Sequence, residues 1–245
     1  MSSVDREPER LRVLILQHEE PTPPGHVTEW LANHGAAVEI FRIDEDDREI
    51  DPTDYDLIVS LGSQFAAFDD TKPFVPREAS LMRTAVDADV PVLGLCFGGQ
   101  MLARVLGAEV FRGEESEIGW LPVRTTDPEL VPEGPWFQWH FDSFRAPPGA
   151  TVIAESDAGP QAFVAGRSLG LQFHPEVTTG IMDDWVRAYR HELDGDGVEP
   201  DALLAETKRI ADDSRARAFQ LFERFLHEVA GIDAPHEADR DERAG

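Results

Sequence analysis

The amino-acid sequence predicts an α/β fold, a three-layer sandwich in which helices cover both faces of a mostly parallel sheet. In the first half of the chain, short apolar, β-branched segments alternate with segments of helical periodicity, as expected of parallel strands joined by helices. In the second half, short apolar segments separated by Pro and Gly turns predict an antiparallel extension. The chain has 245 residues, 41% of them hydrophobic, so it can bury a full core.

The first half begins with an apolar run, LRVLIL at 11–16, which predicts a buried strand. Residues 25–34 follow with apolar side chains at helical spacing, and Gly35 stands where a helix commonly ends. The same alternation continues toward the middle of the chain, with strands expected at 37–42, 55–61 and 90–95 and helices at 74–87 and 98–106.

The second half is dominated by short segments of strand character. Residues 201–229 then show apolar positions at helical spacing and predict one long helix. We expect a single domain over 11–231, flavodoxin-like in its core, between a polar tail at 1–10 and a charged, disordered tail at 232–245. The strands of this half are expected at 108–124, 136–141, 151–155, 161–165 and 168–173.

Charge and composition exclude several classes of function. The 48 acidic and 22 basic residues give a net charge of -26, which repels nucleic acid and anionic membranes. No run approaches the roughly 18 apolar residues that span a bilayer, and the N-terminus lacks the apolar segment of a secretory signal, so we expect a cytoplasmic protein. The acidity fits either a high-salt cytoplasm or a general preference for soluble surfaces.

The single cysteine, Cys96, lies in the most informative segment of the chain. One cysteine excludes an internal disulfide, and a metal site built on cysteines is not expected. A buried strand runs into Gly94-Leu95-Cys96-Phe97-Gly98 and then into a helix, the pattern of a nucleophile on a sharp strand-to-helix turn. The helix N-terminus stabilises a thiolate, and Phe97 N–H is directed toward a developing oxyanion. The alternative is a buried cysteine in a Gly-rich packing turn.

A general base with its orienting carboxylate is predicted at the end of a later strand. His174 ends the strand, Pro175 stops further pairing, and Glu176 is close enough to accept a proton from the imidazole ring. Cys, His and a carboxylate form the set that acyl transfer requires. The alternative interpretation of His174 is a structural histidine that caps the strand.

Together these two segments resemble the class I (triad) glutamine amidotransferases, in particular stand-alone proteins similar to the glutaminase domain of GMP synthase. The resemblance covers nearly the whole chain, from residue 11 to 231. It implies that Cys96 attacks the amide carbon of glutamine to form a thioester. It further implies that His174 protonates the departing ammonia and then activates water, while Glu176 orients His174.

The same resemblance implies substrate-binding residues and no metal or organic cofactor. Gly62 and Ser63 lie in the loop 60–64, whose backbone would supply the second oxyanion N–H. Gln100 would hold the substrate glutamine, and the segment 139–142, with Phe141 and Asp142, would bind its amino-acid end. The sequence departs from the family pattern at Ser63 and Gln64, where a Gly and a Pro are usual, and at 65–70. For His140 and Asp142 a structural role at a strand end stays open.

Three functions remain after these observations. The leading hypothesis is a glutaminase that passes ammonia to a separate synthetase, because the roughly 70 residues after Glu176 contain no G-x-x-x-x-G-K phosphate loop. The second is a γ-glutamyl amide or peptide hydrolase that uses the same triad. The third, from another class, is a non-catalytic regulatory module that has kept the fold.

Overall fold

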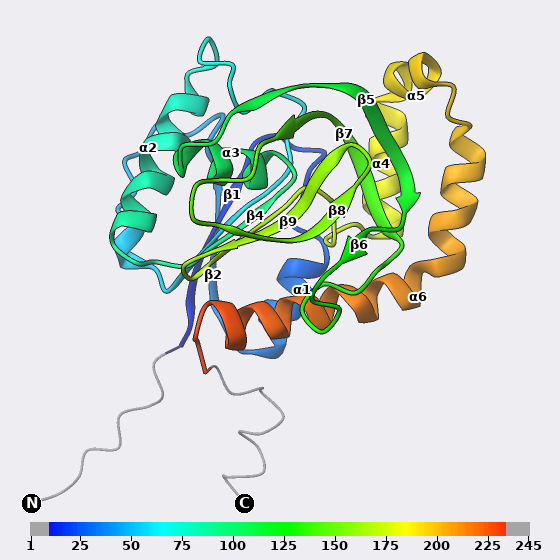
Figure 1. Cartoon of the computed structure of the whole chain (residues 1–245). Coiled ribbons are helices and arrows are strands. Elements are labelled where there is room, and N and C mark those ends of the chain that lie inside the picture. The colour runs from blue at the N-terminus through cyan, green and yellow to red at the C-terminus, as the bar shows by residue number, and fades with distance from the viewer. Residues whose placement is uncertain (1–9, 234–245) are drawn as a thin grey trace, which may run out of the picture.

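Helices and a twisted sheet build three layers in the computed structural model, which describes residues 10–233 (Figure 1). The tails expected at 1–10 and 232–245 lie outside the described residues, except for Arg10, Ile232 and Asp233. The strands are β1 (Arg12–Gln17), β2 (Ala37–Arg42), β3 (Leu57–Ser60), β4 (Val92–Leu95), β5 (Val110–Leu121), β6 (Arg124–Thr125), β7 (Trp136–Phe144), β8 (Thr151–Ser156), β9 (Gly159–Ala165) and β10 (Ser168–Leu171). The helices are α1 (His26–Asn33), α2 (Phe74–Asp87), α3 (Phe97–Val105), α4 (Thr179–Ala188), α5 (Arg190–Asp196) and α6 (Pro200–Arg224), with a 3-10 turn η1 (Pro52–Asp54) and a π-helical turn η2 (Phe225–Val229).

The middle layer, within residues 10–233, is a sheet of eight strands in the order β2-β1-β3-β4-β10-β9-β8-β6. The strands from β2 to β10 in this order run parallel, and β9, β8 and β6 continue the sheet antiparallel. The predicted α/β class, with a mostly parallel sheet and an antiparallel extension, is confirmed. The order places β4 beside β10, so the segments that follow these two parallel strands leave the same edge of the sheet.

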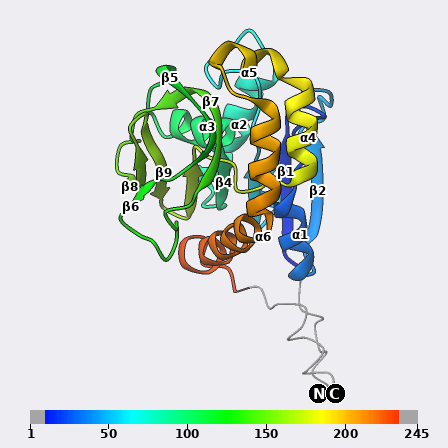
Figure 2. The same ribbon diagram turned by 90° about the vertical axis from the view of Figure 1, so that its right-hand side faces the viewer.

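Both faces of the parallel strands are buried, as their continuous apolar sequence predicted. On β1, Val13 and Ile15 face α1 and α6, where Trp30 and Phe222 fill the core. Leu14 points to the opposite face, toward α2 and α3. Figures 1 and 2 show these two helical layers on either side of the sheet. The sheet is therefore held rigidly between two cores, which fixes the strand ends that carry the site.

β5 and β7 do not join the main sheet, although the sequence suggested strands of one extension there. They pair with each other as a separate antiparallel two-stranded sheet. Trp120 and Phe137 on this ribbon pack against Ile181 and Trp185 of α4. The ribbon buries its apolar side chains against a helix rather than against another strand, and it carries the segment 139–142 to the site.

Two helices, α4 and α5, were not expected from the sequence. The long helix expected at 201–229 is α6, which continues as the π-helical turn η2 over the last five of these residues. Among the described residues no helix combines the length and the apolar character that a bilayer crossing requires.

Candidate active site

The turn between β4 and α3 holds Cys96 in a backbone conformation that few side chains adopt. Its φ is 50° and its ψ is -103°, at the residue directly before the helix. A Cβ on Gly94 would collide with the carbonyl of Gly98, and a Cβ on Gly98 would lie 2.6 Å from Ser60 Oγ. Both glycines are thus required by close packing around the turn. Cys96 N–H donates to Leu171 O at 2.9 Å, which ties the turn to the end of β10.

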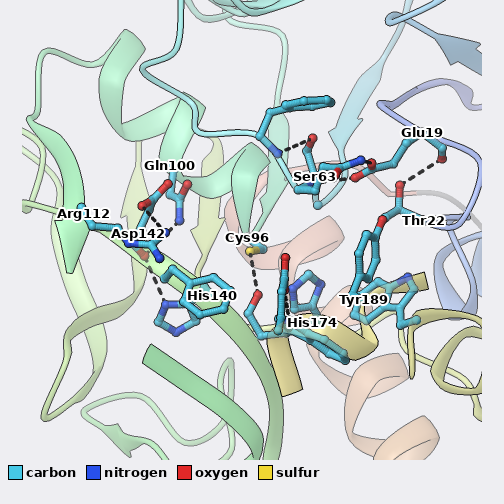
Figure 3. Close-up of a pocket in the computed structure, with 17 residues that line it drawn as sticks. Glu19, Thr22, Ser63, Cys96, Gln100, Arg112, His140, Asp142, His174 and Tyr189 are labelled. Atoms are coloured by element: carbon cyan, nitrogen blue, oxygen red, sulfur yellow. Dashed lines mark hydrogen bonds and ion pairs between the residues drawn. The ribbon is translucent and has the colours of Figure 1, made fainter. Parts of the chain in front are cut away.

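His174 and Glu176 form a buried pair beside this turn. His174 N–H donates to Phe137 O at 2.8 Å, and His174 Nδ1 lies 2.7 Å from Glu176 Oε1. The His174 ring packs edge-on against Trp185, with ring centroids 4.8 Å apart. The two side chains are only 4% and 2% exposed. The hydrogen bond through Nδ1 leaves Nε2 of His174 available to Cys96 (Figure 3).

The charges around His174 favour its protonated form. Burial lowers the pKa of His174, but the negative charges of a Cys96 thiolate and of Glu176 outweigh it and raise this pKa to about 10. The second oxygen of Glu176, Oε2, is buried without a hydrogen-bond partner among residues 10–233, so the carboxylate charge is balanced mainly by His174. The arrangement therefore favours an imidazolium at His174, next to Cys96.

The loop after β3 passes directly over this pair. A Cβ on Gly62 would lie 2.8 Å from His174 Cε1 and 3.9 Å from Cys96 Cβ, so only glycine fits. Gln64 N–H donates to Glu19 Oε1 at 2.7 Å, which anchors the far side of the loop. The loop thus closes one wall of the site with backbone groups.

A pocket opens onto Cys96 and His174, and together with the open solvent at its mouth it holds about 610 Å³ of empty space. Of the substrate-binding residues predicted from the sequence, Gly62, Ser63, Gln100, Phe141 and Asp142 line it. Phe97 does not, because its side chain is 1% exposed and packs on the opposite side of the turn, so only its backbone can serve the site. The other lining residues, besides Cys96 and His174, are Glu19, Thr22, Gln64, Phe65, Arg112, Trp139, His140, Trp185, Tyr189 and Glu192.

A comparison with models of protein families shows to which family the chain belongs. The family model described as glutamine amidotransferase class-I matches residues 26–187 of the chain. The chain belongs to the class-I glutamine amidotransferase family. The family recognised from the Cys96 and His174 segments is confirmed.

Curated and solved relatives of this chain agree with the family assignment. The chain is 29% identical over 153 residues to the glutamine-hydrolysing GMP synthase of Vibrio vulnificus strain YJ016. This match covers 59% of the chain and 28% of that protein. The chain is 36% identical over 145 residues to the GMP synthase of Aeropyrum pernix, covering 52% of the chain and 28% of that protein. The chain thus matches less than a third of the length of these relatives.

Two solved structures each match most of this chain and nearly all of their own length. A glutamine amidotransferase from Thermotoga maritima is 32% identical with a TM-score of 0.81, covering 89% of this chain and 99% of that one. A glutamine amidotransferase from Methylobacillus flagellatus is 26% identical with a TM-score of 0.83, covering 94% of this chain and 98% of that one.

One side of the pocket is built by residues that the sequence did not single out. Glu192 Oε2 accepts a hydrogen bond from Trp139 Nε1 at 2.7 Å. Burial and the nearby charge of Glu19 raise the pKa of Tyr189, which therefore stays a neutral phenol. Figure 3 shows Glu19 and Tyr189 on one side of Cys96, and Gln100 and Asp142 on the other. The pocket extends away from Cys96 in both directions.

The side of the pocket that carries Gln100 is held by hydrogen bonds within the protein. Gln100 Nε2 donates to Asp142 O at 3.2 Å, and His140 Nδ1 lies 3.1 Å from the same oxygen. His140 Nε2 lies 3.0 Å from Glu117 Oε2. Burial raises the pKa of the Asp142 carboxyl, against the opposing effect of Arg112 at 3.4 Å. The contacts of His140 favour a structural role, although His140 lies in the middle of β7 and not at a strand end as expected, while Asp142 lines the pocket.

Proposed function

We propose that this chain is a glutaminase that hydrolyses the side-chain amide of glutamine through a thioester on Cys96 and releases ammonia. The observation that carries the proposal is the strained Cys96 beside the buried His174–Glu176 pair, at the floor of a pocket. Membership of the amidotransferase family supports the same reaction class.

The proposed reaction starts from the thiolate of Cys96 and the imidazolium of His174. The sulfur attacks the amide carbon, a C–S bond forms, and the carbonyl electrons move to oxygen, which accepts hydrogen bonds from Phe97 N–H and from the loop at Gly62. His174 gives its proton to the amide nitrogen, the C–N bond breaks, and ammonia leaves. His174 then removes a proton from water, whose oxygen attacks the thioester, and glutamate departs as the thiolate is restored.

The proposed binding mode places the amino-acid end of glutamine on the Gln100 side of the pocket. Asp142 and Arg112 offer opposite charges there, which suit the ammonium and carboxylate groups of a free amino acid. The backbone of the segment 139–142 would supply further hydrogen bonds. This assignment leaves the opposite side, near Glu19 and Tyr189, beyond the scissile amide.

We extend the proposal to a separate ammonia-accepting synthetase as partner. The curated relatives are glutamine-hydrolysing GMP synthases, and the chain matches only 28% of their length. A pull-down with Cys96→Ala as bait tests this part. Recovery of a synthetase whose product formation from glutamine requires this chain supports it, and ammonia release that no co-purified protein uses argues against it.

A second candidate is a γ-glutamyl amide hydrolase with the same triad. The extension of the pocket past Cys96 on the Glu19 and Tyr189 side favours it, because an amine larger than ammonia has room to leave there. The purified chain should be incubated with glutamine and with γ-glutamyl amides in parallel. Turnover of the amides with glutamine ignored would select the hydrolase.

The catalytic role itself is tested by labelling and by substitution. A glutamine analogue with an electrophilic carbon, such as a diazoketone, should add to Cys96 with a one-to-one stoichiometry. Cys96→Ala should abolish both labelling and turnover while the chain stays folded. A folded sample that resists labelling, with candidate partners added, would favour the non-catalytic regulatory module instead.

A further inference from the structure

A buried hydrogen-bonded chain lies beneath the Gly62 loop and outside the pocket. His18 Nδ1 lies 3.0 Å from Gly62 O, and His18 Nε2 lies 2.7 Å from Glu78 Oε2. Ser60 Oγ donates to Glu78 Oε1 at 2.6 Å. His18 and Glu78 are fully buried, on different elements: His18 follows β1 and Glu78 lies in α2. Buried charged groups are costly unless each polar atom is paired. A buried series of hydrogen bonds in which His18 and Glu78 are both paired therefore suggests that these residues have a function.

In this series of hydrogen bonds, the donor of the bond between His18 and Gly62 is determined by chemistry. A carbonyl oxygen can only accept, so His18 Nδ1 must carry the hydrogen that binds Gly62 O. Burial lowers the pKa of His18, but Glu78 more than offsets it and the pKa is raised, so Nε2 also carries a proton toward the carboxylate. His18 is thereby a donor at both ring nitrogens, locked in one orientation.

The direction of the Gly62 carbonyl also determines the direction of the next N–H group, that of Ser63. In a trans peptide the C=O of one residue and the N–H of the next point in opposite directions. Gly62 O points down to His18, so Ser63 N–H points away from it, on the side where Gly62 and Ser63 line the pocket. The preceding carbonyl is also held, because Gly98 N–H donates to Leu61 O at 3.1 Å.

Two amides of the loop are left without an internal acceptor. Among residues 10–233, neither Gly62 N–H nor Ser63 N–H donates to a protein atom, whereas Gln64 N–H and Phe65 N–H both do. The His18 ring also contacts the Phe97 ring, with centroids 4.5 Å apart, so one side chain touches both the loop and the nucleophile turn.

We propose that His18, oriented by Glu78, is a positioning residue that holds the Gly62–Ser63 peptide with Ser63 N–H facing the oxyanion. The inference rests on the proposed function, because an oxyanion arises only in acyl transfer. If the peptide turned over, the carbonyl of Gly62 would face the oxyanion and repel it. His18 would then govern the barrier to acylation without contacting the substrate.

The test compares reactions of Cys96 that do and do not form an oxyanion. Acylation by p-nitrophenyl acetate forms one and needs no recognition of glutamine, whereas alkylation by iodoacetamide displaces iodide without forming one. His18→Leu should lower kcat for glutamine about 100-fold with little change in KM, lower acetylation at least about tenfold, and leave alkylation within about twofold. His18→Asn keeps a donor near Nδ1 and should recover about tenfold of the loss.

His34 provides the matched control. It is also a buried histidine, bonded through Nε2 to Glu223 Oε1 at 2.9 Å, but it lies between α1 and α6, away from the pocket. His34→Leu should destabilise the chain yet keep both reactions at the wild-type ratio. The inference is overturned if His18→Leu keeps the ratio of acetylation to alkylation, if both reactions fall together, or if His34→Leu changes the ratio equally. A wild type that ignores glutamine but is acetylated would refute the proposed substrate while the ratio still decides the role of His18.

Discussion

At the scale of single residues, Gly62 links loop geometry to chemistry most directly. Its Cα faces the imidazole of His174, and an added Cβ would lie 2.8 Å from Cε1. We predict that Gly62→Ala displaces either the loop or the ring and lowers kcat/KM for glutamine about 100-fold, or about 3 kcal/mol of transition-state stabilisation. Steady-state kinetics measure the loss, and thermal denaturation measures stability.

Gly195 supplies the control for this substitution. It lies in the short, exposed helix α5, and a Cβ there would meet no atom within 4 Å. Gly195→Ala should leave kcat/KM unchanged and stabilise the chain by up to about 1 kcal/mol, because alanine favours a helix. Equal kinetics for Gly62→Ala and wild type would show that the loop does not contact the reacting groups.

The raised pKa of His174 predicts the alkaline limit of the reaction. Hydrolysis needs the imidazolium proton for the leaving nitrogen, so kcat/KM should fall as pH rises through about 10, where His174 loses that proton. Alkylation of Cys96 by iodoacetamide needs only the thiolate and should not fall there. Profiles of the two rates from pH 5 to pH 11 measure the difference.

Glu176→Gln tests the cause assigned to this pKa. The substitution keeps a hydrogen-bonding side chain at 2.7 Å from Nδ1 but removes a negative charge that raises the pKa of His174. The alkaline limit of kcat/KM should therefore move to lower pH. If the variant is fully folded and its alkaline limit of kcat/KM does not move, that limit belongs to the titration of another group.

At the scale of elements, α4 joins the fold to the pocket. Thr178 caps this helix by accepting a hydrogen bond from Ile181 N–H at 3.2 Å, and Trp185 on the same helix packs against His174. We predict that Thr178→Ala lowers the free energy of unfolding by about 1 kcal/mol, whereas Thr178→Ser, which keeps the hydroxyl, stays near wild type. Urea denaturation of the three chains measures this, and equal losses for both variants would show that the cap contributes nothing.

The elements also show how far sequence reasoning reaches. The helix expected at 74–87 coincides with α2, because its fourteen residues between two apolar strands carry a clear helical period. α4 was missed, although Ile181, Met182 and Trp185 form a helical face. It follows the segment of His174 directly and is short, and its packing partners on β5 and β7 are remote in sequence.

The residues of the site likewise fall into those that the sequence reveals and those that it does not. Cys96 and His174 lie in local patterns whose glycines and proline have steric reasons, so a linear sequence reveals them. Glu19, Arg112 and Glu192 reach the pocket from three distant segments, and no spacing connects them. His18 could not be selected either, because its importance lies in one hydrogen bond to a backbone carbonyl that only the folded loop presents.

At the scale of the whole molecule, net charge should govern how stability responds to salt. The 48 acidic residues exceed the 22 basic ones, so repulsion among carboxylates outweighs the attraction in the exposed ion pairs, which are individually weak. Salt screens both the repulsion and the attraction, and the repulsion is the stronger of the two. The folded, compact state suffers more from this repulsion than the expanded unfolded chain.

We therefore predict that the chain becomes more stable as NaCl rises from about 0.02 M to 0.5 M, by about 1 kcal/mol or roughly 3 °C in Tm, since the Debye length falls to a few ångströms over this range. Melting curves in NaCl and KCl at equal ionic strength measure the effect. A rise that ends once screening is complete fits an acidic surface that serves only solubility, whereas a continued rise into molar KCl fits a surface adapted to a high-salt cytoplasm. A Tm that falls with the first additions of salt would mean that the attraction in ion pairs such as Arg215–Glu29 and Arg42–Asp44 contributes more to stability than the repulsion among the carboxylates takes away.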